Sequence, residues 1–335
     1  MKLLHFPFFF FLLIAKSVSA QTDAESAQKQ MMDSIKNVYL TEAAIRNPLL
    51  RQVTISTDVI SSSNIRSQLY GNDLFEGKLS QVRTKALLSI PLKSWGKNSL
   101  SASFSLFHQH FNLHDVKFIQ PIANSFNERS VDKLTVGFTG SYTRVDSLFG
   151  RQIIYMGSLS GLTGRSSSIQ KVSYLGGVIL TLKQTPEKRV SVGLLLNLDP
   201  SIDIPVIPFY TYWRKYQNGM ELNVNLPQEV SVRKSLSDRF WASFGTSISG
   251  SVAFFRYAEP GFPKDVNFSI VDLKTGPKIE YRFAEKLIFG LNAGLLTPIQ
   301  ARQFEVSEKA NDYFLKNKIN STPFVNFSIS VLPFL

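Results

Sequence analysis

Apolar and polar residues alternate with a period of two along most of the chain beyond about residue 51. The alternation is clearest in residues 79–92 and 99–111, where the second segment sets apolar side chains against a row of serines. Successive side chains of a β-strand point to opposite faces, so this pattern predicts strands with one apolar and one polar face. Fourteen segments fit the pattern: residues 53–62, 79–92, 99–111, 132–145, 151–162, 170–183, 189–198, 205–214, 220–226, 230–234, 240–255, 267–283, 287–297 and 322–335.

The connections between these segments alternate in length. Those after even-numbered segments are short, as in DSLFG at 146–150, whereas most of the others are longer, notably 63–78, 112–131 and 298–321. Short periplasmic turns alternate with longer external loops in outer-membrane barrels. The sequence therefore predicts an all-β fold, a transmembrane antiparallel up-and-down β-barrel of about 14 strands, with both ends of the chain in the periplasm.

The strand count depends on residues 220–234, which we divide at Pro227-Gln228-Glu229. Read as one strand, this stretch leaves an odd number, and single-chain bacterial barrels have even numbers of strands. Twelve strands, with the first segment excluded, is the alternative count.

The N-terminal 50 residues lie outside this pattern. Residues 1–20 resemble a secretory signal peptide, with Lys2 before an apolar run and a small-residue site that predicts cleavage after Ala20. Residues 21–50 are polar with scattered apolar positions and predict a periplasmic N-terminal arm, which leaves 51–335 for the barrel. We therefore expect a Gram-negative outer-membrane protein whose partners are membrane lipid, lipopolysaccharide and the barrel-assembly machinery.

The composition of the chain excludes several other classes of protein. The chain has no cysteine and 27 phenylalanines, and its mean hydropathy is −0.01. No apolar stretch approaches the ~20 residues that a transmembrane helix needs. A soluble β-sandwich would have a similar composition, but aromatic residues predicted to face outward near the short turns favour a membrane-interface girdle. They are Tyr142, Trp213, Phe240, Phe283 and Phe289.

The run TYWRKYQNGMELNVNLP, which ends with Asn223 to Pro227, resembles an uncharacterised family of outer-membrane barrels common in Bacteroidetes-type bacteria, a domain of unknown function. The final segment, Phe324 to Leu335, is similar to the C-terminal assembly signal of such barrels, although the aromatic Phe334 stands one place before the end. The resemblance covers about residues 50–335 and implies a barrel, but no established activity and no site residues.

The predicted inward faces carry more basic than acidic residues. By alternation the inward acidic residues are Asp58, Glu221, Asp272 and Glu280. The inward basic residues are Arg83, Lys85, Lys133, Lys171, Lys183, Arg214, Arg233, Lys274, Lys278 and Arg282. Pairs across strands that brace the wall are the simpler role for these charges, and an excess of positive charge in an open pore would attract anions. Because the basic residues are spread over many strands, they do not indicate nucleic-acid binding.

Three of the four histidines lie in HQHFNLH, and His108 and His110 share one face of a strand. Two imidazoles at this spacing can approach one Zn²⁺ or Cu²⁺ ion, so they are weak metal candidates, and a polar barrel rim is the plainer explanation. They also lie on the lipid-facing side, where a Ser-His pair could modify lipid, but no partnered acid or GxSxG motif is visible. We therefore expect no enzyme activity and no cofactor.

The sequence thus predicts a passive, porin-like channel for small solutes of unknown identity, with a weak anion preference. A structural or interaction barrel with a closed lumen is the alternative, and a lipid-modifying outer-membrane enzyme is a third possibility.

Overall fold

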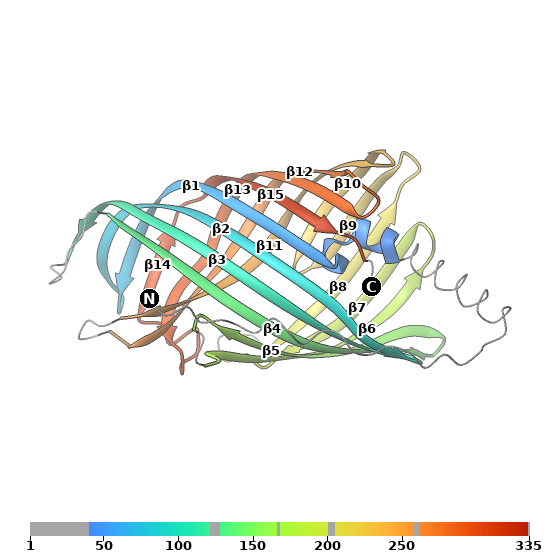
Figure 1. Cartoon of the computed structure of the whole chain (residues 1–335), viewed down its shortest axis with the longest axis horizontal. Helices are drawn as coiled ribbons and strands as arrows, with labels where there is room; N and C mark the ends of the chain where they lie inside the picture. Colours follow the sequence, from blue (N-terminus) through green and yellow to red (C-terminus); the bar gives the residue numbers. More distant parts are fainter. Residues whose placement is uncertain (1–39, 121–127, 166–167, 200–204, 258–261, 334–335) are drawn as a thin grey trace, which may run out of the picture.

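A computed structural model describes residues 40–120, 128–165, 168–199, 205–257 and 262–333 (Figure 1). These residues form a single antiparallel sheet. Its strands are β1 (Val53–Leu69), β2 (Asn72–Trp95), β3 (Asn98–Phe118), β4 (Arg129–Leu148), β5 (Arg151–Thr163), β6 (Lys171–Gln184), β7 (Lys188–Asn197), β8 (Val206–Lys215), β9 (Met220–Leu226), β10 (Glu229–Ser237), β11 (Phe240–Arg256), β12 (Asp265–Arg282), β13 (Leu287–Glu305), β14 (Leu315–Ile319) and β15 (Thr322–Val331).

The sheet closes into a ring. Each strand from β1 to β13 pairs with its neighbours in the chain, and both β14 and β15 pair with β13 on one side and β1 on the other. The short β14 and β15 therefore share one place, and the 15 strands make a ring of 14 positions. The predicted antiparallel barrel and its strand count are confirmed, including the division of 220–234, since β9 and β10 pair as a hairpin.

The outer face of the ring is apolar. Large side chains that point away from the lumen are highly exposed, among them Phe138 at 50%, Leu194 at 58%, Phe244 at 60% and Phe327 at 56%. A single closed sheet with such a surface has no second sheet to cover it, which rules out the soluble sandwich and identifies a transmembrane β-barrel. None of the helices in the described residues is long and apolar enough to cross a membrane.

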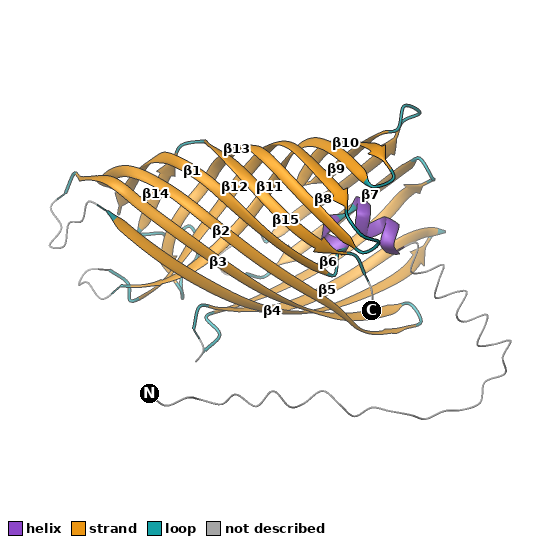
Figure 2. Ribbon diagram, turned by 45° about the horizontal axis from the view of Figure 1, so that its top comes forward, coloured by secondary structure: helices purple, strands orange, loops and turns teal. Residues whose placement is uncertain are grey.

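The two ends of the barrel differ. We call the end with short connections such as 149–150 and 238–239 the turn end, and the opposite end the loop end. A helical segment at 40–46 and a 3-10 turn, Pro48–Leu50, lie at the turn end beside the last residues of β15 (Figure 2). Ala44 in this segment is fully buried against Ile288 and Leu332, so the segment docks inside the ring.

Two of the long loops predicted from the sequence are largely strands in the structure, so these two predictions are wrong. Residues 63–78 continue β1 and β2 as a hairpin around the turn Tyr70-Gly71. Most of 298–321 belongs to β13 and β14. A bulge between Ile60 and Ser63 shifts the alternation there, which concealed the strand in the sequence. Residues 112–131 contain the ends of β3 and β4, and 121–127 lie outside the described residues.

The strands on one side of the ring are about twice as long as those on the other side. β1 to β4 and β11 to β13 have 17 to 24 residues, whereas β7 to β10 have only 7 to 10. β5 pairs with β4 only from Val136 onward, and β10 pairs with β11 only up to Ser247. Toward the loop end, the edges of β4 and β11 are therefore free to approach each other.

The long strands close on themselves at the loop end. Gln109 of β3 and Thr135 of β4 both donate to the backbone oxygen of Val252 on β11, each at 3.2 Å. The space that these strands enclose is filled by a buried apolar core. Its members are Ile65, Leu79, Phe111, Ala253, Phe268, Ile270 and Ala301. Among the described residues, the loop end of the barrel therefore encloses a buried apolar core.

Candidate functional site

The lumen below this core is crossed by a buried ion pair. Arg83 on β2 contacts Asp272 on β12, and their side chains are 4% and 1% exposed. Because β1, β13 and β15 separate these two strands in the ring, the pair spans the interior. Arg83 also donates from Nε and Nη2 to Oε1 of Gln81, at 3.0 and 2.7 Å.

A second polar layer lies beside the first. Lys274 Nζ is 2.6 Å from an oxygen of Asp58, whose other oxygen accepts from Asn326 at 2.8 Å. Lys85 lies close enough to Lys274 for electrostatic repulsion. Within the described residues Lys85 has no ion-pair partner, so it is the one lysine of this layer whose charge is not neutralised.

The third layer joins the barrel to the docked N-terminal segment. Glu280 forms ion pairs with Arg51 at 2.8 Å and with Lys278 at 2.9 Å. Arg51 Nε also donates to the backbone oxygen of Ala44, and Arg233 donates to that of Ile45. The segment is therefore held by Arg51, which lies between it and β1, and by Arg233 on β10.

The remaining basic candidates lie nearer the wall. Lys133 on β4 stacks over the ring of Phe255 on β11 at 4.3 Å, which again links the two edges at the loop end. Lys171 pairs with Asp199 at 3.0 Å. Arg282 donates to the backbone oxygen of Asp238 at the turn end.

Three sequence-based orientations are wrong. Trp213 points into the lumen, where it donates to Glu221 and lies under Arg46, so it is not part of the outward girdle. Its neighbour Arg214 consequently faces outward and stacks on Tyr216. Lys183 follows a bulge after Thr181 and pairs with Val190, an outward position. Aromatic residues occupy both faces of β8, so alternation alone did not fix its orientation.

The packed layers fill one side of the lumen only. Several inward residues of β2, β3 and β12 are buried, as Arg83 at 4%, Gln109 at 1% and Ile270 at 1% show. Inward polar residues of β9 and β11 are accessible: Ser249 is exposed, and Asn223 and Asn225 are half-buried. A polar surface lined by serine and asparagine thus remains along β9 and the part of β11 near the end of β10.

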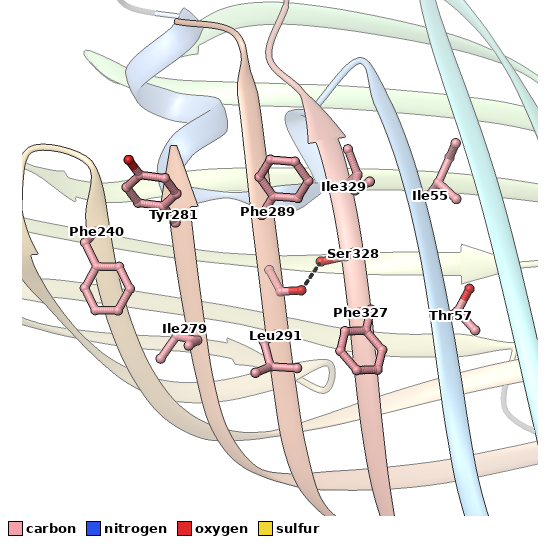
Figure 3. Close-up of a pocket in the computed structure, with 11 residues that line it drawn as sticks. Ile55, Thr57, Phe240, Ile279, Tyr281, Phe289, Leu291, Phe327, Ser328 and Ile329 are labelled. Carbon is pink, nitrogen blue, oxygen red and sulfur yellow. Dashed lines mark hydrogen bonds between the residues drawn. The ribbon is translucent and has the colours of Figure 1, made fainter. Parts of the chain in front are cut away.

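The outer wall carries a groove of about 470 Å³ across β11, β12, β13, β15 and β1 (Figure 3). Phe240, Phe289 and Phe327 are among the side chains that line it, and the Ser328 hydroxyl there donates to the backbone oxygen of Gly290. These side chains face the bilayer, so the groove is suited to the acyl chain of a lipid and does not lead into the lumen.

The two histidines proposed as metal candidates lie on the outer wall with partners that sequence reasoning missed. His108 Nε2 and His110 Nδ1 are 3.1 and 3.0 Å from Oδ1 of Asp132 on β4, and Ser130 Oγ is 3.3 Å from His110 Nε2. The pairing of His110 with Asp132 in the β3–β4 register is the signal that could have found them. No group of three or more potential ligands among the described residues is arranged to hold a metal ion.

Comparison with known proteins found distant likenesses to solved structures. No family model and no curated protein matches the chain. An outer membrane channel from Pseudomonas putida F1 is 7% identical, with a TM-score of 0.32 over 84% of this chain and 96% of that one. The transport unit of the Escherichia coli autotransporter AIDA-I is 9% identical, with a TM-score of 0.32 over 88% and 97%. The translocator domain of NalP from Neisseria meningitidis is 8% identical, with a TM-score of 0.28 over 93% and 98%. At these TM-scores none of the likenesses indicates a function for this chain.

Proposed function

We propose that this chain is a bacterial outer-membrane channel that passes small hydrophilic solutes with a weak preference for anions. The observation that carries the proposal is the contrast between the two sides of the lumen. Ile270 is 1% exposed on the packed side, whereas Ser249, on the inward face of the neighbouring strand just beyond its last pair with β10, is exposed. A route for solutes therefore follows the short strands and avoids the barrel axis.

The lining of this route selects for polar solutes. Hydroxyl and amide side chains such as Ser249, Asn223 and Asn225 offer both donors and acceptors to a passing molecule. Arg83, Lys171, Lys274 and Lys278 are ion-paired. Lys85 has no ion-pair partner among the described residues, so we expect it to contribute to the anion preference.

The bilayer location rests on the outer wall. An apolar exterior on a closed barrel satisfies every backbone polar group within hydrocarbon, and such barrels are typical of bacterial outer membranes. Short connections are typical of the periplasmic end of such barrels, so we expect the turn end, with the segment at 40–50 docked in it, to face the periplasm. That segment supports the alternative of a closed structural barrel.

Single-channel recording of the full chain in planar bilayers separates the two functions. We expect a small conductance with weak anion selectivity at 0.1 M salt that vanishes near 1 M, where the Debye length falls to about 3 Å. Lys85→Glu should shift the reversal potential toward cations, and Lys85→Met should abolish the preference. A barrel that inserts but never conducts would establish the closed reading.

A further inference from the structure

Ser130, His110 and Asp132 form a continuous chain of polar contacts on the outer wall. The Oγ atom of Ser130 is 3.3 Å from Nε2 of His110, and Nδ1 of the same ring is 3.0 Å from Oδ1 of Asp132. The two ring nitrogens thus face a hydroxyl and a carboxylate, in the order that activates a serine nucleophile. The contact between serine and imidazole is slightly long, as is common before substrate binds.

The β3–β4 register holds this arrangement in place. His110 stands directly opposite Asp132, and Ser130 is two residues from Asp132, so all three side chains leave the same face of the sheet. Both strands are paired on this side over residues 98–113 and 129–144, which fixes the backbone beneath the three groups. Sites built on paired strands keep their geometry better than sites on loops.

The cluster lies where the apolar belt of the barrel ends. Toward the turn end, the outward residues of the same two strands are Leu134, Val136, Leu106 and Phe104, which are 51%, 40%, 49% and 48% exposed. Toward the loop end the outward residues are polar, beginning with Ser130 itself and Asn112. An outer-leaflet lipid beside this wall would lay its acyl chains on the apolar residues and present its ester groups at the level of the cluster.

We infer that the outer wall carries a second, catalytic function, the hydrolysis of carboxylic acyl esters of outer-leaflet lipids. Ser130 Oγ attacks the ester carbonyl while His110 Nε2 takes the hydroxyl proton, and Asp132 stabilises the resulting imidazolium. The imidazolium then gives its proton to the departing alcohol, which leaves an acyl-serine. Water attacks that ester with His110 again as base, and the products are a free fatty acid, the alcohol and the regenerated serine.

Asn112 is the donor placed to stabilise the oxyanion. It pairs with Ser130 across the two strands and shares its outward face, so its side chain leaves the sheet next to that of the nucleophile. This role makes Asn112 a second test position, since loss of one oxyanion donor typically lowers the rate by about 10²–10³-fold.

His108 distinguishes this reading from a metal site. It also contacts Asp132, at 3.1 Å, but it has no contact with Ser130 among the described residues and lies outside the relay. A hydrolase of the proposed kind needs His110 and tolerates the loss of His108, whereas a metal site built on both histidines needs each of them.

The test uses the full chain in vesicles of phosphatidylethanolamine, with fatty-acid release and labelling by a fluorophosphonate as readouts. We expect labelling of the wild type and none of Ser130→Ala, and a fall in release of about 10²–10⁴-fold in Ser130→Ala and His110→Ala. Ser141→Ala, an inward serine of the same strand, is the matched control and should behave as the wild type, as should His108→Ala. Heat-modifiable migration in gels reports that each variant is folded.

Two results would overturn the inference. One is folded wild-type protein that releases fatty acid no faster than Ser130→Ala and takes up no fluorophosphonate. The other is activity that EDTA removes and that falls equally in His108→Ala and His110→Ala, which would indicate a metal site. Conductance depends on the lumen and hydrolysis on the outer wall, so neither result bears on the proposed channel.

Discussion

Removing one partner of the Arg83–Asp272 pair should destabilise the barrel strongly. The change Asp272→Leu leaves the Arg83 guanidinium, which is 4% exposed, with Gln81 as the one side-chain acceptor recorded among the described residues. Breaking a buried ion pair by deleting one partner typically costs about 3–5 kcal/mol, because an uncompensated charge stays buried. We expect a loss of stability in this range.

The measurement is urea unfolding of the refolded protein, followed by the fluorescence of its three tryptophans. The double variant Arg83→Met/Asp272→Leu removes both charges and should recover most of the loss, since apolar replacements of a buried pair are often neutral. Lys85→Met is the control, because its side chain has no ion-pair partner among the described residues, and it should cost less than about 1 kcal/mol.

One outcome would refute this reasoning. If Asp272→Leu and Lys85→Met cost the same small amount, Arg83 is solvated in the native barrel. The lumen would then be open between β2 and β12, and the route along the short strands would lose its basis.

Three further predictions concern the membrane and assembly. Phe138→Arg should lower the free energy of unfolding in a bilayer by about 2–4 kcal/mol, as at a membrane midplane. Thr139→Arg on the lumen side should lower it by no more than the one hydrogen bond it removes, ~1 kcal/mol. Equal losses in a vesicle unfolding assay would contradict the assignment of faces. Deleting Phe324 to Leu335 removes most of β15 and leaves β1 and β13 with unpaired edges, so cell fractionation should find the chain in the periplasm and not inserted. Epitopes inserted at 308–311 should bind antibody on intact cells and those at 149–150 should not; the reverse pattern would invert the topology.

The alternation of the chain was sufficient to predict the ring and its strand count, because the lipid side of each strand must be apolar for the whole width of the bilayer. It failed where that constraint ends. Beyond the apolar belt β1 and β2 continue with polar residues on their outer face and a bulge after Ile60, so the pattern no longer marks a strand. On β8 aromatic residues occupy both faces, and the orientation of Trp213 depends on its contact with Glu221.

The alternation of apolar and polar residues does not predict which side chains of distant strands contact each other. It assigned Arg83 and Asp272 to the inward face, but their pairing depends on the width of the barrel and on which strands face each other across it. A sequence-based design that changes Arg83 to Glu together with Lys85 and Lys278 would therefore disturb folding as well as selectivity. The relay on the outer wall was missed for a related reason, since Asp132 meets His110 only through the register of β3 with β4.

Substituted-cysteine blockade tests the central claim, that the open route follows the short strands beside a packed axis. The chain has no cysteine of its own, so a single thiol can be placed at Ser249, exposed on β11, or at Ile270, 1% exposed on the adjacent β12. A charged thiosulfonate added during single-channel recording should reduce the current of Ser249→Cys and leave that of Ile270→Cys unchanged. Blockade at Ile270→Cys with none at Ser249→Cys would place the pathway through the axis and contradict the account.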